Sequence, residues 1–104
     1  MSRTIRVLWK NCNSGWRNFN WNGVIDKNSV VHIAASEGHA DPGSSFGIVR
    51  TRGDARISVE NVRPHGETNA GGGVEFWLAV GWEAPINVVT DITVVDAAEQ
   101  GFIA

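Results

Sequence analysis

The most informative stretch of this chain is residues 73–82, in which apolar side chains recur at every second position. Successive side chains of an extended chain point to opposite faces, so this alternation predicts a β-strand with one face buried in a core. The apolar parity consists of Val74, Phe76, Leu78, Val80 and Trp82. The other parity carries Glu75 and Trp77, so we expect the Trp77 indole on the opposite face of the sheet, outside the apolar interior.

Six further segments have strand character, because they are short, rich in β-branched or aromatic residues, and bounded by turn-forming residues. They comprise residues 4–10, 16–21, 29–35, 46–51, 55–62 and 87–96. No segment has the period of an amphipathic helix. The pattern predicts an all-β fold: a single-domain antiparallel β-sandwich over residues 1–104, with about seven to eight short strands in an Ig-like or jelly-roll-like arrangement.

Turn signals predict how some of these strands connect. Residues 11–15 are rich in turn formers, so the strands at 4–10 and 16–21 are expected to form a hairpin. Residues 36–45 and 63–73 show no strand period and are expected to be long loops. Arg52, Gly53 and Asp54 are expected at a hairpin tip. This tripeptide matches one that adhesion receptors read, but Gly-Asp is also an ordinary turn element, so an adhesive role stays open.

Composition narrows the classes of function. Lys and Arg total 9 against 11 for Asp and Glu, a formal net charge of -2. Nucleic-acid binding needs a basic surface, so no nucleic-acid partner is expected. The longest apolar stretches are far shorter than the ~20 residues of a membrane-spanning helix, so no membrane span is expected.

The cysteine content and the N-terminus bear on the compartment. Cys12 is the only cysteine, which excludes a disulfide within the chain. The N-terminal residues enter a strand pattern almost at once, and no signal peptide is visible. Both features are compatible with a cytoplasmic protein and with one secreted without a visible signal.

The aromatic and amide residues point to a ligand. The chain has five Trp and four Phe but no Tyr. An indole can stack on the apolar face of a sugar ring, while amide and carboxylate groups bond its hydroxyls. We therefore expect a carbohydrate-binding, lectin-like module, acting as a homo-oligomer because single sites of this kind are weak. The candidate ligand-binding residues are Trp77, Glu75, Trp16, Asn18 and Asn20.

Two alternatives to this hypothesis follow from the same residues. Trp77 can instead be packing, if a loop or a partner chain covers the polar face, and the Asn residues can simply make turns and outward strand positions. The chain can also be a self-assembly or protein-interaction domain without a small-molecule ligand. In that case Trp77, Leu8 and Val89 are expected to form an exposed apolar strip that a second copy covers.

Catalytic and metal signatures are weak. The serines lack the strand-turn-helix context that presents a nucleophile, so we expect no enzyme activity and no cofactor. The three histidines have no standard zinc spacing, and His32 is expected to be packed or half-buried. Glu37, His39 and Asp41 alternate in a predicted loop, a pattern that can hold a cation but is more typical of a solvated loop. No metal is therefore expected.

Overall fold

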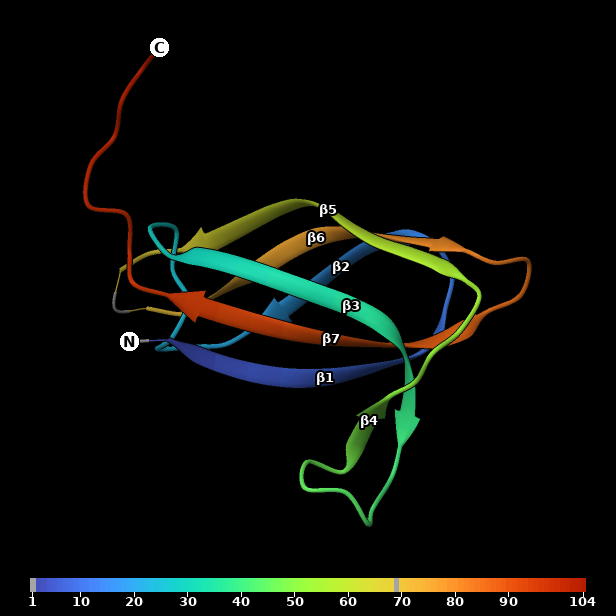
Figure 1. Ribbon diagram of the computed structural model, residues 1–104. Coiled ribbons are helices and arrows are strands. Elements are labelled where there is room, and N and C mark those ends of the chain that lie inside the picture. The colour runs from blue at the N-terminus through green and yellow to red at the C-terminus, as the bar shows by residue number, and fades with distance from the viewer. Residues whose placement is uncertain (1, 69) are drawn as a thin grey trace.

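The computed structural model describes residues 2–68 and 70–104, and in these residues it contains two packed antiparallel sheets and no helix (Figure 1). The predicted β-sandwich is confirmed. One sheet has the strand order β1-β7-β3-β4 and the other has the order β2-β6-β5. The strands are β1 (Arg3–Cys12), β2 (Gly15–Asn20), β3 (Val30–Ala40), β4 (Ile48–Arg50), β5 (Arg56–Gly66), β6 (Gly72–Gly81) and β7 (Ile86–Val95).

The strand pairing is nested. The first strand pairs with the last, β1 with β7, and the second with the second to last, β2 with β6. In an Ig domain the first strand instead pairs with the second. The observed strand order therefore resembles a jelly roll more than an Ig domain. The hairpin expected from 4–10 and 16–21 is wrong, because β1 and β2 belong to different sheets and the turn at 13–14 carries the chain from one to the other.

The core lies between the sheets and confirms the alternation along β6. Val74, Phe76 and Leu78 are fully buried, and they face Val88, Ile92 and Val94 of β7 across the interior. Trp9 meets the edge of the Phe76 ring, with centroids 5.9 Å apart. One expectation fails at the end of the run: Trp82 is 49% exposed, because β6 ends at Gly81 and the chain turns before this residue can reach the core.

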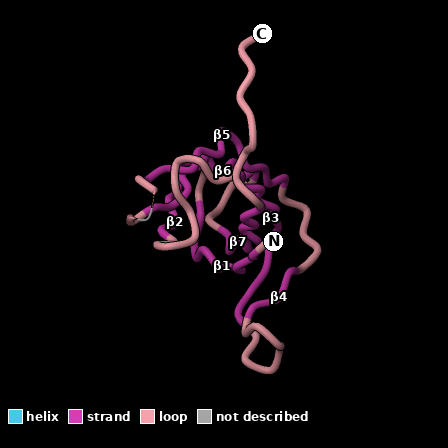
Figure 2. The backbone as a smooth tube through the Cα atoms, turned by 90° about the vertical axis from the view of Figure 1, so that its left-hand side faces the viewer, coloured by secondary structure: helices cyan, strands magenta, loops and turns pink. Residues whose placement is uncertain are grey.

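A hairpin of β3 and β4 projects from the sandwich as an arm (Figures 1 and 2). The loop predicted at 36–45 is therefore partly wrong, since β3 continues to Ala40. Gly38 allows the close approach, because a Cβ there would collide with the Val89 side chain and the Val49 carbonyl oxygen. Val89 points away from the core yet is fully buried, and the close packing at Gly38 and Val49 accounts for this cover.

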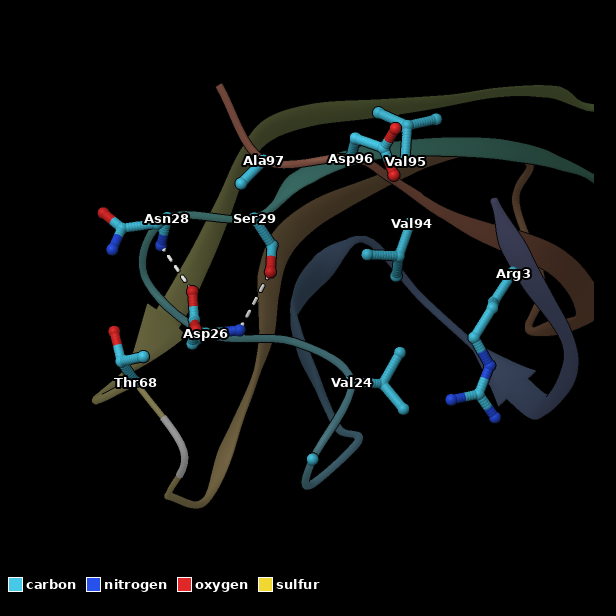
Figure 3. Close-up of a pocket in the computed structure, with 11 residues that line it drawn as sticks. Arg3, Val24, Asp26, Asn28, Ser29, Thr68, Val94, Val95, Asp96 and Ala97 are labelled. Atoms are coloured by element: carbon cyan, nitrogen blue, oxygen red, sulfur yellow. Dashed lines mark hydrogen bonds between the residues drawn. The ribbon is translucent and has the colours of Figure 1, made fainter. Parts of the chain in front are cut away.

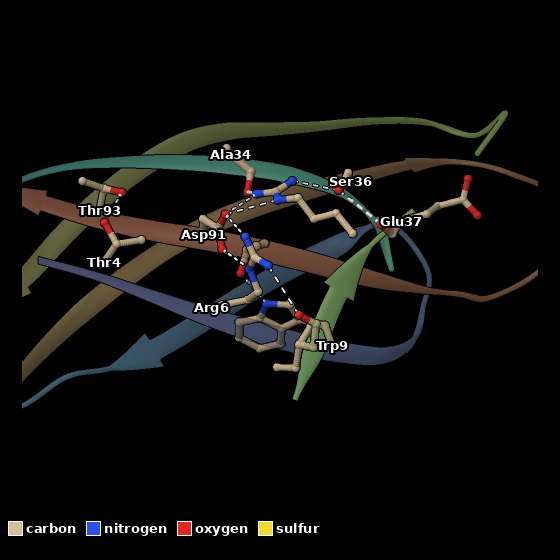
Figure 4. A network of polar contacts seen from close by, with 11 residues as sticks. Thr4, Arg6, Trp9, Ala34, Ser36, Glu37, Asp91 and Thr93 are labelled. Atoms are coloured by element: carbon tan, nitrogen blue, oxygen red, sulfur yellow. Dashed lines mark hydrogen bonds and ion pairs between the residues drawn. The ribbon is translucent and has the colours of Figure 1, made fainter. Parts of the chain in front are cut away.

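The arm is fastened to the four-stranded sheet by Asp91 of β7 (Figure 4). Arg6 of β1 donates to both carboxylate oxygens, at 2.8 and 3.0 Å, and the Arg50 guanidinium of β4 donates at 2.9 Å. Arg50 also donates to Ser36 Oγ at 2.7 Å. The hydrogen bond from Arg6 is the main cause of the lowered pKa of Asp91. Partial burial of the carboxylate raises this pKa, and the hydrogen bond from Arg50 lowers it further.

The two other predicted connections also differ from expectation. Residues 52–54 are not a hairpin tip, because they join β4 of one sheet to β5 of the other. The Glu37 carboxylate lies against Gly53 and accepts a hydrogen bond from the Ala55 amide at 3.4 Å. The loop predicted at 63–73 shrinks to the turn of a β5-β6 hairpin, since β5 extends to Gly66. Its residue Asn69 lies outside the described residues.

Candidate functional site

The outer face of the three-stranded sheet brings together all five candidate ligand-binding residues. The register of β2 on β6 places Trp16 opposite Trp77 and Asn18 opposite Glu75, with Asn20 opposite Gly73. Phe19 of β2 points inward and packs against the core. The candidate residues of β2 alternate with the inward-facing positions, so their side chains point outward. Two segments more than 50 positions apart in sequence thus share one face.

The two indoles on this face contact each other. Their ring centroids lie 5.4 Å apart at an interplanar angle of 84°, an edge-to-face pair. Trp16 is 56% exposed and Trp77 is half-buried. Trp77 therefore lies outside the core, as the alternation predicts, and part of its cover comes from the neighbouring indole.

A chain of polar side chains lies beside the indole pair. His65 Nε2 and Asn18 Oδ1 are 2.6 Å apart, and Asn18 Nδ2 donates to Asn20 Oδ1 at 2.8 Å. Because the Asn18 amide nitrogen is the donor in the second bond, its oxygen accepts in the first, which places a proton on His65 Nε2. The amide nitrogen of Asn20 ends the chain and faces solvent, where it can donate to a ligand.

Gly73 makes room for this chain. His65 lies on β5 opposite Gly73, whereas Asn18 lies on β2, so the imidazole spans the central strand β6. A Cβ at position 73 would stand only 2.7 Å from Asn20 Oδ1 and would also collide with the Phe19 carbonyl oxygen. The glycine is thus required by a close approach of neighbouring groups.

Arg63 and His65 reach this face because β5 contains a bulge. Trp77 pairs with Glu60, and Glu75 pairs with Arg63. Two residues of β5, Asn61 and Val62, therefore lie opposite the single residue Phe76 of β6. Asn61 occupies the extra position with φ 52°, in the left-handed region. The bulge reverses the inside-outside alternation in the rest of β5. Arg63 and His65 were not predicted on this face, because residues 63–73 were expected to be a loop.

One ion pair, between Arg63 and Glu75, lies on this face. Arg63 Nη1 lies 3.4 Å from Glu75 Oε1, with side chains 67% and 43% exposed, so this ion pair adds little stability. The Ser58 hydroxyl donates to Glu60 Oε2 at 3.2 Å. A face with an ion pair, a hydrogen-bonded carboxylate, amides and indoles suits a neutral polar ligand better than an ion.

The strip expected for self-assembly does not exist. Leu8 and Val89 pair with each other in the four-stranded sheet, whereas Trp77 lies on the opposite sheet. Val89 is also fully buried. These three side chains therefore cannot form one surface, because the prediction placed strands of different sheets side by side.

The acidic and histidine side chains of the described residues do not gather into a metal site. Among residues 2–68 and 70–104, no three His, Cys, Asp or Glu side chains are grouped so that they could hold a metal ion. Glu37 instead contacts the turn at Gly53. His32 is exposed, so the expectation that it would be packed or half-buried is wrong. The described part of the chain has no helix long and apolar enough to cross a bilayer.

Comparison of the chain with family models, with curated proteins and with solved structures finds no match.

Proposed function

We propose that this domain is a non-enzymatic, lectin-like carbohydrate-binding module whose binding surface is the outer face of β2, β6 and β5. The observation that carries the proposal is the meeting of Trp16 and Trp77 with Asn18, Asn20 and Glu75 on one uncovered face. Sugar recognition needs an apolar platform beside donors and acceptors, and this face supplies both.

In this proposal the indole pair binds the apolar face of a sugar, and the polar side chains beside it bind the hydroxyl groups. The apolar face of a sugar ring stacks on the exposed indole of Trp16 or on the uncovered part of the Trp77 indole. The Asn20 amide donates to a ring hydroxyl, and Glu75 accepts from another, in competition with its exposed pair to Arg63. The face is an open sheet surface, which favours a terminal residue or an extended chain of sugars over an enclosed small molecule.

A surface of this kind binds weakly. We expect dissociation constants on the order of 1 mM for a single sugar, about -4 kcal/mol. Weak sites gain avidity when several are linked, so the proposal includes a homo-oligomer that presents more than one face to a multivalent glycan.

The test is a glycan array followed by titration of the strongest ligands, recorded by intrinsic tryptophan fluorescence. Trp77→Ala is expected to weaken binding at least tenfold, because it removes the platform at the centre of the face. Trp82→Ala is the control, since Trp82 is an exposed indole that lies beyond the end of β6. Unchanged binding by Trp77→Ala, or equal losses in both variants, would rule out this face.

Self-association is a second candidate for the same face. Trp16 lies on β2, an edge strand of its sheet, and is exposed, so a second copy could cover it. Analytical ultracentrifugation separates the two ideas. If Trp16→Ala and Trp77→Ala convert an oligomer to monomer and no glycan binds, the face is an interface and the carbohydrate proposal fails.

A further inference from the structure

Two adjoining cavities lie at one end of the sandwich. They are separate from the outer face of β2, β6 and β5 that carries Trp16 and Trp77, which we call the indole face. The first, of about 470 Å³, is bounded by the turn after β2, the β5-β6 turn and the segment that follows β7 (Figure 3). The second, of about 520 Å³, shares Gly23, Val24 and Asp26 with it. Binding sites for small molecules commonly have volumes of this order.

Backbone hydrogen bonds hold the walls of these cavities in place. The amides of Val24 and Ile25 both donate to the Trp21 carbonyl oxygen at 3.1 Å, and the Lys27 amide donates to the Gly66 carbonyl oxygen at 2.8 Å. Asn22 Oδ1 accepts from the Gly72 amide at 3.1 Å. The turn after β2 is thus tied both to itself and to the β5-β6 hairpin, which gives a site that is formed before a ligand arrives.

Polar groups stand on opposite sides of the first cavity. Asp26 Oδ1 accepts from the Asn28 amide at 2.8 Å, which fixes the carboxylate and leaves its second oxygen as an acceptor. Figure 3 shows Asp26, Asn28 and Thr68 on one side and Arg3 on the other. The Arg3 guanidinium lies 5.3 Å from the centre of the Trp21 ring, a contact that orients it.

Apolar side chains separate these polar groups. Val24 and Val94 lie between Arg3 and Asp26 in the view of Figure 3. The lining thus combines an apolar patch, donors on Arg3, Asn28 and Thr68, and carboxylates on Asp26 and Asp96. Since one guanidinium and two carboxylates line the space, a ligand with a large net charge of either sign meets at least one repulsive group.

From this arrangement we infer that the loop-end cavity is a second binding site, which takes a neutral polyhydroxylated ligand of one or two sugar rings. Its donors and carboxylates match hydroxyl groups, and Val24 and Val94 match the apolar face of a ring. None of its lining residues lies on the indole face. The inference therefore does not depend on the function proposed for that face, although both sites would select related ligands.

The test uses four probes, the methyl glycosides of glucose, galactose, mannose and N-acetylglucosamine, each titrated into the full chain while backbone amide NMR signals are recorded. At least one probe is expected to shift the amides of residues 23–29 and 95–97. Asp26→Asn keeps the Oδ1 acceptor of the turn but replaces the free carboxylate oxygen with an amide, and it should weaken this response at least tenfold. Asp54→Asn, in an exposed loop elsewhere, is the matched control.

Two further variants keep the outcome interpretable. Trp77→Ala should leave the loop-end response unchanged, while abolishing any response on β2 and β6. If Asp26→Asn does not fold, Arg3→Gln removes the opposite wall of the cavity and should weaken the same response. The inference is overturned if no probe shifts the loop-end amides, or if their response survives both cavity variants. If only the indole face does not bind sugar, the amide signals of residues 16–20 and 73–79 would not shift, while those of the loop end would.

Discussion

At the scale of single residues, asparagine has two distinct roles in this fold. Asn11 and Asn61 adopt positive φ angles of 53° and 52° at the bulges of β1 and β5. Asn18 and Asn20 instead lie on the indole face and bond to each other. From the sequence, turn positions, outward strand positions or ligand contacts were expected for the Asn-rich segment. No bulge was expected, because a bulge depends on the register of a partner strand.

The Asn61 bulge gives a prediction about backbone conformation. Glycine adopts the left-handed region freely, whereas alanine there costs about 1 kcal/mol or more. Asn61→Ala should therefore lower the free energy of unfolding by about 1–2 kcal/mol, while Asn61→Gly stays within about 0.5 kcal/mol of the parent. Urea unfolding measures both. An alanine variant as stable as the glycine variant would show that position 61 is not held in this conformation.

The hydrogen bond between Trp9 and Thr90 gives a second prediction. Trp9 Nε1 donates to Thr90 Oγ1 at 2.8 Å, and Thr90 is fully buried. Trp9→Phe removes the donor and leaves a buried hydroxyl, so stability should fall by about 1–3 kcal/mol beyond the loss of ring area. Adding Thr90→Val to this variant should recover part of the loss. If the double variant is less stable by the full sum of the single effects, the two groups are not coupled.

At the scale of elements, the periodicity of the sequence predicted where strands exist but not how they pair or end. All seven predicted strand segments overlap observed strands, and every one of them except β4 contributes side chains to the core. The β1-β2 hairpin failed because turn formers signal a change of direction and not which strand follows as a neighbour. The candidate face was predicted on β2 and β6, where alternation is regular, and missed on β5, because residues 63–73 were expected to be a loop.

The fastening of the arm predicts how stability depends on pH. The folded pKa of Asp91 is below its unfolded value, because Arg6 first and Arg50 after it stabilise the carboxylate. The stability that Asp91 contributes is therefore fully present above the unfolded pKa, about 4, and is lost as the pH falls through the lower folded pKa.

Asp91→Asn tests this dependence. The variant should be less stable than the parent near neutral pH, and the difference should shrink as the solution is acidified below the ordinary carboxyl range. Thermal unfolding across this pH range measures the difference, with Asp54→Asn as a control whose difference from the parent should stay small throughout. A gap for Asp91→Asn that is constant with pH would contradict the assignment.

At the scale of the whole molecule, the two sheets and the loop end of the sandwich have different structural features. One sheet is partly covered by its own arm, which buries Val89 and engages Asp91. The other sheet carries the indoles and the polar chain on its outer face, and the loop end carries the cavities. The loop-end cavities were not predicted, because they form where segments distant in sequence converge: the turn after β2, Thr68 beyond β5 and the segment that follows β7.

The most direct test of the central claim follows the indole N–H signals of the five tryptophans by NMR during titration with a glycan that the protein binds. The experiment uses the Asp26→Asn variant, so that the loop-end cavity does not contribute. The account predicts that the signals of Trp16 and Trp77 shift together and saturate, while those of Trp9 and Trp82 stay in place. Binding that leaves Trp16 and Trp77 unmoved would contradict it.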